Sequence, residues 1–412
     1  MVILFVHQNF PGQFKHLAPA LVKRGHKVLA LTIKDAPPID WMGVRVIPYM
    51  PARGSTANIH PWVVDIETKI IRAEAAFRAA VALRGQGLRP DLIVAHPGWG
   101  ESLFLKDVWP EAKLAIYCEF FYHPTGADVG FDPEFSTIDL SEVCRLRLKN
   151  LNNEMHFQVA DAALSPTQWQ ASTFPEPFRS KITVVHDGIN TRQLKPEPRP
   201  AFLPAAGQAL GLAIDPDRPV VTFVNRNLEP YRGYHSFMRA LPRILRENPR
   251  AAVFIVGADG VSYGSAPASG TWKNIFIQEV RSQISDEDWK RVTFFGHLDY
   301  ERFVLLIRLS TVHVYLTYPF VLSWSLLEAM SLGCAIVGSR TPPVQEVITD
   351  AENGLLVDFF SPEEIAQAVA RLLANTEERA QFGTVARDRV VQNYDLESIC
   401  IPKQMQWVES LR

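Results

Sequence analysis

Two arginines and a glycine lie in one short segment directly after an apolar run in the second half of the chain. Asn225, Arg226, Arg232 and Gly233 follow the run at 220–224. Open parallel sheets bind ligands at the carboxyl ends of their strands, so a loop at this position is where a ligand would meet the protein. Guanidinium groups form paired, charge-assisted hydrogen bonds with phosphate oxygens. The segment predicts a phosphate-binding loop, with a solvated basic loop as the alternative.

Further along the chain, the carboxyl group of Glu328 lies in an otherwise apolar segment. Ser323 and Ser325 suit the start of a short helix, and Glu328 falls inside that helix. A buried carboxylate is costly without a partner, and sugar hydroxyls are good partners for it. A structural salt bridge is the alternative. Further on, Thr341 and Pro342 begin another predicted helix, where backbone amides are expected to face an anion.

Three loops in the first half carry aromatic or titratable side chains after predicted strands. The glycine of the first loop could let backbone amides approach an anion, although it also suits a plain strand-to-helix turn. Aromatic rings stack on sugar faces, while core packing and turn capping are the competing roles. The candidates in these loops are Phe10, Gly12, His96, Trp99, Glu119, Phe121, Tyr122 and His123.

Parallel strands are needed to position all these segments. Short, continuous apolar runs are typical of strands buried on both faces, and helical sequence follows most of them. This alternation predicts an α/β protein with two doubly wound parallel sheets. The predicted strands are 2–6, 27–32, 91–95, 113–118, 220–224, 252–256, 292–295, 312–316 and 335–337, and the predicted helices include 65–83 and 234–247.

A proline-rich segment around 195–204 predicts the domain boundary, because prolines prevent a helix or central strand from continuing. We therefore expect an N-terminal domain at 1–198, a C-terminal domain at 199–393 and a final segment at 394–412.

Composition argues against several classes of protein. The 412 residues include 42 Lys and Arg against 44 Asp and Glu, a net charge of −2 that gives no argument for nucleic-acid binding. With 47% hydrophobic residues the chain is not a disordered one. Four scattered cysteines, and the acidic pairs Asp215/Asp217 and Asp286/Asp288, do not indicate a metal site. No apolar stretch predicts a signal peptide or membrane span, so we expect a cytoplasmic protein; attachment at the inner face of a membrane stays open.

The order and spacing of the motifs resemble the GT-B glycosyltransferases, family 4 in particular. The resemblance covers nearly the whole chain and implies two Rossmann-like domains facing across a cleft, with the last helix crossing back to the first domain. It implies retaining, metal-independent transfer of a sugar from a nucleoside diphosphate sugar to a glycan, a lipid-linked or another sugar-containing acceptor, with no cofactor beyond that donor. The motifs that carry it are the Gly12 loop, His186-Asp-Gly188-Ile-Asn190, the Arg226/Arg232 loop, Leu326-Leu-Glu328-Ala-Met, and Glu346-Val-Ile followed by Asn353-Gly-Leu-Leu-Val.

The resemblance also implies roles for single residues. Arg226 and Arg232 match the basic pair that grips the donor diphosphate, and Glu328 matches the glutamate that bonds the nucleotide ribose. Phe320 stands where the family has another glutamate, one that touches the donor sugar, so this departure puts sugar choice in doubt. The implied catalytic residues are His96, Glu119, Arg226 and Arg232; the implied donor-binding residues are Gly12, Asn225, Arg226, Arg232, His297, Ser323, Ser325, Glu328, Thr341 and Pro342; the acceptor side is Phe10, Trp99, Phe121, Tyr122 and His123.

Two rival functions stay open. A sugar-nucleotide epimerase on the same fold would use His96, Glu119 and His123 as acids and bases. A catalytically silent partner subunit that binds a sugar nucleotide would explain Phe320.

Overall fold

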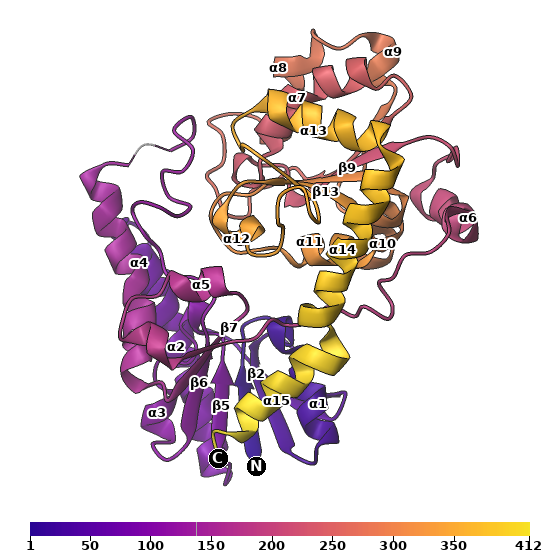
Figure 1. Cartoon of the computed structure of the whole chain (residues 1–412). Helices are drawn as coiled ribbons and strands as arrows, with labels where there is room; N and C mark the ends of the chain where they lie inside the picture. Colours follow the sequence, from indigo (N-terminus) through magenta and orange to yellow (C-terminus); the bar gives the residue numbers. More distant parts are fainter. Residues whose placement is uncertain (137) are drawn as a thin grey trace. The chain divides into compact units, whose positions relative to one another are not determined.

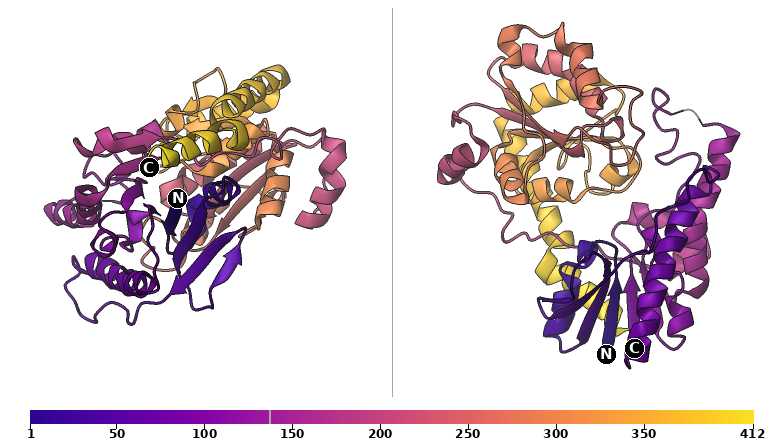
Figure 2. Two further views of the ribbon diagram at one scale, coloured as in Figure 1. Left: turned by 90° about the horizontal axis from the view of Figure 1, so that it is seen from below. Right: turned by 180° about the vertical axis from the view of Figure 1, so that it is seen from behind.

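The computed structural model describes residues 1–136 and 138–412, which form two compact units. Unit 1 comprises Met1–Gly188 together with Leu396–Arg412, and unit 2 comprises Ile189–Asp395. Each unit is built on a parallel sheet with helices packed against it (Figures 1 and 2). The prediction of two doubly wound α/β domains is confirmed. The first boundary lies at Gly188, ahead of the predicted position at 198.

The sheet of unit 1 is centred on β1, which pairs with β2 on one side and β5 on the other. Its strand order is β3-β4-β2-β1-β5-β6-β7-β8, and only the β3–β4 pair is antiparallel. The strands are β1 Val2–Val6, β2 Lys27–Ile33, β3 Ile39–Trp41, β4 Val44–Tyr49, β5 Leu92–Ala95, β6 Lys113–Tyr117, β7 Ala162–Ser165 and β8 Ile182–Val184.

Both faces of this sheet are buried. Leu4 and Val6 of β1 belong to one apolar cluster, whereas Ile3 and Phe5 belong to another, because alternate side chains of a strand point to opposite faces. This is why the strands read as continuous apolar runs. The helices of unit 1 are α1 Leu17–Lys23, α2 Val64–Gly85, α3 Leu105–Val108, α4 Leu140–Val159, α5 Gln168–Ser172 and α15 Ile401–Glu409, with short 3-10 turns η1 Gly12–Phe14, η2 Pro97–Trp99 and η3 Phe178–Lys181.

The C-terminal segment belongs to unit 1. Trp407 and Val408 of α15 pack into the cluster that contains Ile3 and Phe5, and the Gln404 side-chain amide donates to the His186 carbonyl. A π-helical turn, η5 Leu396–Cys400, leads into α15.

The sheet of unit 2 has the order β11-β10-β9-β12-β13-β14 and is parallel throughout. Its strands are β9 Val220–Asn227, β10 Ala252–Ala258, β11 Val292–Phe294, β12 Val312–Tyr315, β13 Ala335–Ser339 and β14 Leu355–Val357. Its helices are α6 Arg199–Leu210, α7 Tyr234–Glu247, α8 Trp272–Arg281, α9 Asp286–Trp289, α10 Tyr300–Leu309, α11 Trp324–Ser331, α12 Pro342–Gln345, α13 Pro362–Ala374 and α14 Thr376–Tyr394, with the 3-10 turn η4 Pro230–Arg232.

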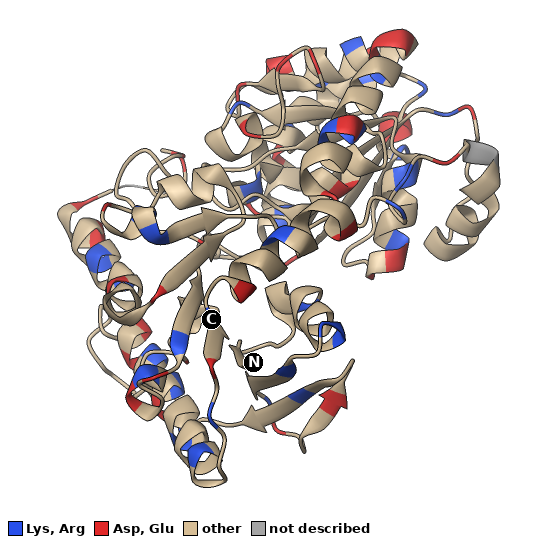
Figure 3. Cartoon of the chain, turned by 60° about the horizontal axis from the view of Figure 1, so that its bottom comes forward, with Lys and Arg blue, Asp and Glu red and all other residues tan. Residues whose placement is uncertain are grey.

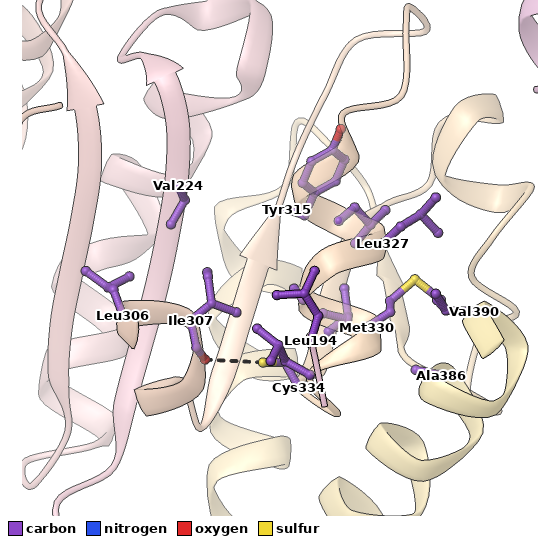
Figure 4. Packing of buried hydrophobic residues seen from close by; sticks show 14 of the residues in the cluster. Leu194, Val224, Leu306, Ile307, Tyr315, Leu327, Met330, Cys334, Ala386 and Val390 are labelled. Carbon is purple, nitrogen blue, oxygen red and sulfur yellow. Dashed lines mark hydrogen bonds between the residues drawn. The ribbon is translucent and has the colours of Figure 1, made fainter. Parts of the chain in front are cut away.

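An apolar cluster joins α10, α11 and α14 to this sheet (Figure 4). Met330 of α11 packs beside Val390 of α14 there, and the Cys334 thiol donates to the Ile307 carbonyl at 3.4 Å. This packing holds α11, which carries the predicted site residues Ser325 and Glu328 and is capped by Ser323.

The expectation that the proline-rich segment contains no helix is wrong. Helix α6 spans Arg199–Leu210 and holds Pro204 in its interior. A proline there removes a backbone donor, but Phe202 and Ala206 of the same helix are buried against the α10 residues Leu306 and Ile307. Tertiary burial therefore outweighs the local cost.

Charged side chains of both signs are interspersed over the helices, and the strands are mostly uncharged (Figure 3). Among the described helices, none is long and apolar enough to cross a bilayer.

Candidate active site

The strand order of unit 2 reverses between β9 and β12. The chain runs from β9 outward to β10 and β11, and then returns to β12 on the other side of β9. The loops after β9 and β12 therefore diverge, which makes the crevice at their carboxyl ends the favoured ligand site in this type of sheet. Arg226 lies near the end of β9, and Arg232 follows the strand in the 3-10 turn η4.

Arg232 lies buried in this crevice with neutral partners. Its side chain is 6% exposed, and Nη1 donates to Thr317 Oγ1 at 2.7 Å and to the Val321 carbonyl at 3.1 Å. The guanidinium also lies 5.0 Å from the centre of the Tyr263 ring. Within residues 1–136 and 138–412, no carboxylate forms an ion pair with Arg232. A buried cation that lacks an anion is suited to receive one from a ligand.

Arg226 is the opposite case. It lies exposed near the end of β9, and its side chain makes no hydrogen bond or ion pair with the described residues. Its neighbour Asn225 donates through its side-chain amide to the Arg232 carbonyl at 3.4 Å. The loop thus offers one fixed and one free guanidinium group.

Glu229, which was not predicted as a site residue, connects the loop at 262–264 to the loop that carries Arg232. Its side chain is 1% exposed and accepts from the backbone N–H groups of Ser262, Tyr263 and Gly264 at 3.0, 3.4 and 3.1 Å. These contacts hold Tyr263 over Arg232. The only sequence signal was a carboxylate between Leu228 and a proline in the loop.

Phe320 belongs to an aromatic cluster formed by Tyr231, Tyr263, Tyr318 and Phe320. Its ring meets Tyr231 edge-on, with centres 5.2 Å apart at 89°, and lies 5.2 Å from the Tyr263 ring. The side chain is 4% exposed. The position at which the family has a glutamate is therefore an apolar one here, beside the ring that covers Arg232.

Glu328 is buried in α11 and accepts from the Tyr300 hydroxyl at 2.9 Å. Burial, together with the Glu328 charge, raises the pKa of Tyr300, which keeps it a hydrogen-bond donor. At the start of α11, Ser323 Oγ accepts from the Ser325 backbone N–H at 3.3 Å, and the Ser323 N–H donates to Tyr315 Oη at 2.9 Å. Both serines therefore serve the helix cap.

The expectation of free amides at Thr341 and Pro342 is wrong. The Thr341 N–H donates to the Ser339 carbonyl at 2.8 Å, and the Val344 N–H donates to the Thr341 carbonyl at 3.0 Å. Pro342 and Pro343 have no N–H to offer. These backbone donors are therefore used within the turn or absent. His297 lies exposed after β11, the outer strand of the sheet.

In unit 1 the strand order reverses between β1 and β5, and a histidine follows each of these strands. His7 Nδ1 accepts from the Asn9 N–H at 3.0 Å, so its Nε2 donates to Gln13 Oε1 at 2.8 Å. Burial lowers the pKa of His7 to about 4. Gly12 has φ +47°, and any side chain there would collide with the His7 ring. The N–H groups of Gly12 and Gln13 have no acceptor among the described residues, which leaves them available to a ligand.

His96 lies 2% exposed between the rings of Trp99 and Tyr117, at 4.5 and 5.4 Å. Its Nδ1 accepts from the Gly98 N–H at 3.2 Å, as in a turn cap. The proton of the neutral ring is then on Nε2, which has no hydrogen-bond partner among the residues that the structure describes and lies 3.7 Å from Glu119 Oε2. Burial, with the nearby His7, lowers the pKa of His96, so the ring is neutral.

A cavity of about 220 Å³ brings His96, Trp99, Glu119 and Tyr122 together. The sequence analysis missed its basic wall from helices α2 and α4, which consists of Lys69, Arg72 and Lys149. Lys69 is paired with Asp65 at 2.7 Å, whereas Lys149 Nζ lies 3.5 Å from the centre of the Tyr122 ring. Burial lowers the pKa of Lys149 to about 8.

Three predicted acceptor-side residues lie outside this cavity. Phe121 packs against Phe174 in the core, and His123 Nε2 contacts the Thr173 carbonyl at 2.5 Å. Phe10 lines a separate cavity in unit 1. No cluster of three or more potential metal ligands was found among the residues that the structure describes.

Two family models match the chain. One, described as "Glycosyl transferase family 4 group", matches residues 24–194, and one described as "Glycosyl transferases group 1" matches residues 211–389. A curated relative, the GDP-mannose-dependent alpha-(1-6)-phosphatidylinositol monomannoside mannosyltransferase of Mycolicibacterium smegmatis, is 24% identical over 277 residues, with 61% of this chain and 62% of the relative covered. The chain spans about half the length of several other curated relatives.

Solved structures share the fold. Sucrose-phosphate synthase from Thermosynechococcus elongatus has a TM-score of 0.73 at 18% identity, with 100% of this chain and 99% of that chain covered. HepE from Anabaena, in complex with UDP-glucose, has a TM-score of 0.67 at 16% identity, with 100% of both chains covered. These likenesses confirm the predicted GT-B fold.

Proposed function

The chain belongs to the group 1 glycosyltransferases, and from that membership we propose that it transfers a sugar from a nucleoside diphosphate sugar to a sugar-containing acceptor. The observation that supports this most directly is the buried guanidinium of Arg232 with its neutral partners. In the transfer, the C–O bond of the donor breaks and the diphosphate leaves with the electron pair. A preorganised cation beside the leaving group stabilises the charge that grows there.

Several residues would share that work in the proposed reaction. In unit 2 the exposed Arg226 would contact the diphosphate. In unit 1 the free amides of Gly12 and Gln13 suit an anion. Glu328 would accept from hydroxyl groups of the nucleotide. The neutral His96 would donate from Nε2 to a sugar hydroxyl, with Glu119 close by. Attack on the same face of the donor sugar, with the acceptor proton passing to the leaving phosphate, gives retention without a metal ion.

The relatives suggest which donors to test. One relative is named for GDP-mannose and one structural neighbour binds UDP-glucose. A panel of UDP, GDP, ADP and dTDP, each free and as its hexose, would therefore be tested for thermal stabilisation in EDTA. A nucleotide at about 100 times its dissociation constant should add roughly 2.7 kcal/mol to the free energy of unfolding. Release of that nucleotide in the presence of simple glycan and glycolipid acceptors would then establish transfer, and the anomeric configuration of the product would test retention.

A silent sugar-nucleotide-binding subunit is the second candidate, and the buried aromatic position of Phe320 favours it. It predicts stabilisation by the nucleotide without nucleotide release. An epimerase would instead convert the donor into a new sugar nucleotide with no acceptor present. A chain that no nucleotide of the panel stabilises would contradict all three functions.

A further inference from the structure

A second cavity in unit 1, of about 520 Å³, has no role in the function proposed above. It is lined by the loop after β1, the end of β2 and the hairpin β3–β4. The volume lies in the range of small-molecule sites, and such sites are mostly apolar with a few polar groups. The apolar lining residues are Phe10, Pro11, Ile33, Ala36, Pro37, Ile39, Trp41, Val46 and Pro48.

The Thr32 hydroxyl and several backbone groups of the wall are used by the fold itself. Thr32 Oγ1 donates to the Gln8 carbonyl at 2.9 Å and accepts from the Phe10 N–H at 3.1 Å. The Ile33 N–H also donates to the Gln8 carbonyl, at 3.1 Å. Phe10 meets Trp41 edge-on, with ring centres 5.5 Å apart. The hydrogen bonds fix the β1 loop against the end of β2, and the ring contact joins it to the hairpin, so the cavity is a built feature of the unit.

One charged group in this wall is free. Lys34 is exposed at the end of β2, and its side chain makes no hydrogen bond or ion pair with any described residue. Ile39 contributes an apolar surface that is 48% exposed. An apolar chamber with an unpaired ammonium group beside it fits a molecule that has an apolar chain joined to an anionic group.

The position of the cavity relates it to the sugar-transfer site. It lies at the carboxyl end of β1, and its wall at Phe10 and Pro11 is continuous with Gly12, whose N–H is free. We propose that this cavity holds the apolar chain of an amphipathic acceptor, with Lys34 contacting the phosphate or carboxylate that joins the chain to the rest of the molecule. This inference rests on the proposed function, because it names the class of acceptor that the same site would use.

Calorimetric titration of the full chain with octyl phosphate and methyl phosphate tests the proposal, because the two probes share an anion and differ in the chain. Each buried methylene should tighten binding about fourfold, so octyl phosphate should bind at least about tenfold more tightly than methyl phosphate. Titrations stay below the micelle concentration. Equal binding of the two probes would overturn the proposal.

Variants locate the binding. Ala36→Trp fills the chamber and Ile39→Asp places a charge in its wall, so each should remove the preference for octyl phosphate. Met42→Asp is the matched control, because Met42 lies on the same hairpin, is 62% exposed and does not line the cavity. Its φ of +52° suits an aspartate. A preference that survives both cavity variants would place the chain elsewhere and refute the proposal.

Lys34→Met separates the two parts of the ligand. It should weaken the binding of octyl phosphate about tenfold and leave the binding of octyl glucoside, which has no anionic group, unchanged. An unchanged affinity for octyl phosphate would refute the role of Lys34. Binding of UDP, measured on the same samples, reports the donor site independently. If the wild type binds UDP but binds octyl phosphate and methyl phosphate equally well, this inference alone is refuted. If it prefers octyl phosphate but does not bind UDP, the donor proposal alone is refuted.

Discussion

Replacing Arg232 with methionine separates a ligand-binding cation from a structural one. The two hydrogen bonds from Nη1, at 2.7 and 3.1 Å, each stabilise the fold by about 1.5–3 kcal/mol because the donor is charged. Burial of the cation costs several kcal/mol in the opposite direction, and no carboxylate of the described part of the chain compensates it. We therefore expect Arg232→Met to change the free energy of unfolding by no more than about 2 kcal/mol, in either direction.

The same substitution should have a much larger effect on nucleotide binding. A bidentate contact of an arginine with a diphosphate is worth about 3–6 kcal/mol, so the dissociation constant of UDP, or of whichever nucleotide stabilises the wild type, should rise at least about a hundredfold. Thermal unfolding with and without the nucleotide measures both quantities in one experiment. Arg243→Met is the matched control, because Arg243 is paired with Glu247 at 2.6 Å on the surface of α7 in the same unit.

Two results would refute this reasoning. If Arg232→Met lowers the free energy of unfolding by more than about 4 kcal/mol and still binds the nucleotide as the wild type does, Arg232 is a structural link between β9 and β12. If Arg243→Met weakens nucleotide binding as much as Arg232→Met does, only the net charge of the unit matters, and the buried position of Arg232 has no special role.

Two further predictions concern Arg226 and Glu229 in unit 2, and a third concerns Glu101, a buried carboxyl group of unit 1. Arg226→Met should leave thermal stability unchanged and weaken nucleotide binding about tenfold by titration, because Arg226 is exposed and unpaired among the described residues. Glu229→Gln should lower the free energy of unfolding by about 1–3 kcal/mol, because an amide N–H would face three backbone N–H groups. It should also weaken nucleotide binding. An unchanged affinity for the nucleotide would show that the Tyr263 loop does not support the role of Arg232. Burial raises the pKa of Glu101 from 4.5 to about 7, so the folded state holds a proton that the unfolded state loses. The wild type should therefore lose about 3 kcal/mol relative to Glu101→Gln as the pH rises through that range, measured by chemical unfolding; a constant difference would contradict the buried, protonated carboxyl group.

The fold was largely predictable from the sequence because buried parallel strands and amphipathic helices leave strong local patterns. Helix α7 spans Tyr234–Glu247, as expected, and β1 spans Val2–Val6. The prediction for the proline-rich segment was wrong for a physical reason. Helix α6 is stabilised by the burial of Phe202 and Ala206, and this burial depends on α10, about a hundred residues further along the chain. Local sequence does not contain that contact.

The site was predictable only in part. The loops after β9 and β12 were expected to matter because they follow predicted parallel strands, whose carboxyl ends bind ligands. Pro342 and Pro343 could have been excluded as amide donors from the sequence, because proline has no N–H, whereas the use of the Thr341 N–H by the Ser339 carbonyl appears only in the structure. The contacts of Glu229 with the loop at 262–264, and of Lys149 with Tyr122, could not be foreseen, because each joins segments that only the folded chain brings together.

The two units share a physical feature at the point where their strand order reverses. In unit 2 a buried cation, Arg232, has no anion among the described residues, and in unit 1 a buried ring N–H, His96 Nε2, has no acceptor. Both arrangements cost stability in the free protein, because buried polar groups are normally satisfied within the fold. An anionic ligand would satisfy Arg232 in unit 2, and a hydroxyl oxygen would satisfy His96 Nε2 in unit 1. Substitutions that remove the unmet groups should therefore reduce the response to the donor more than they reduce the stability of the free chain.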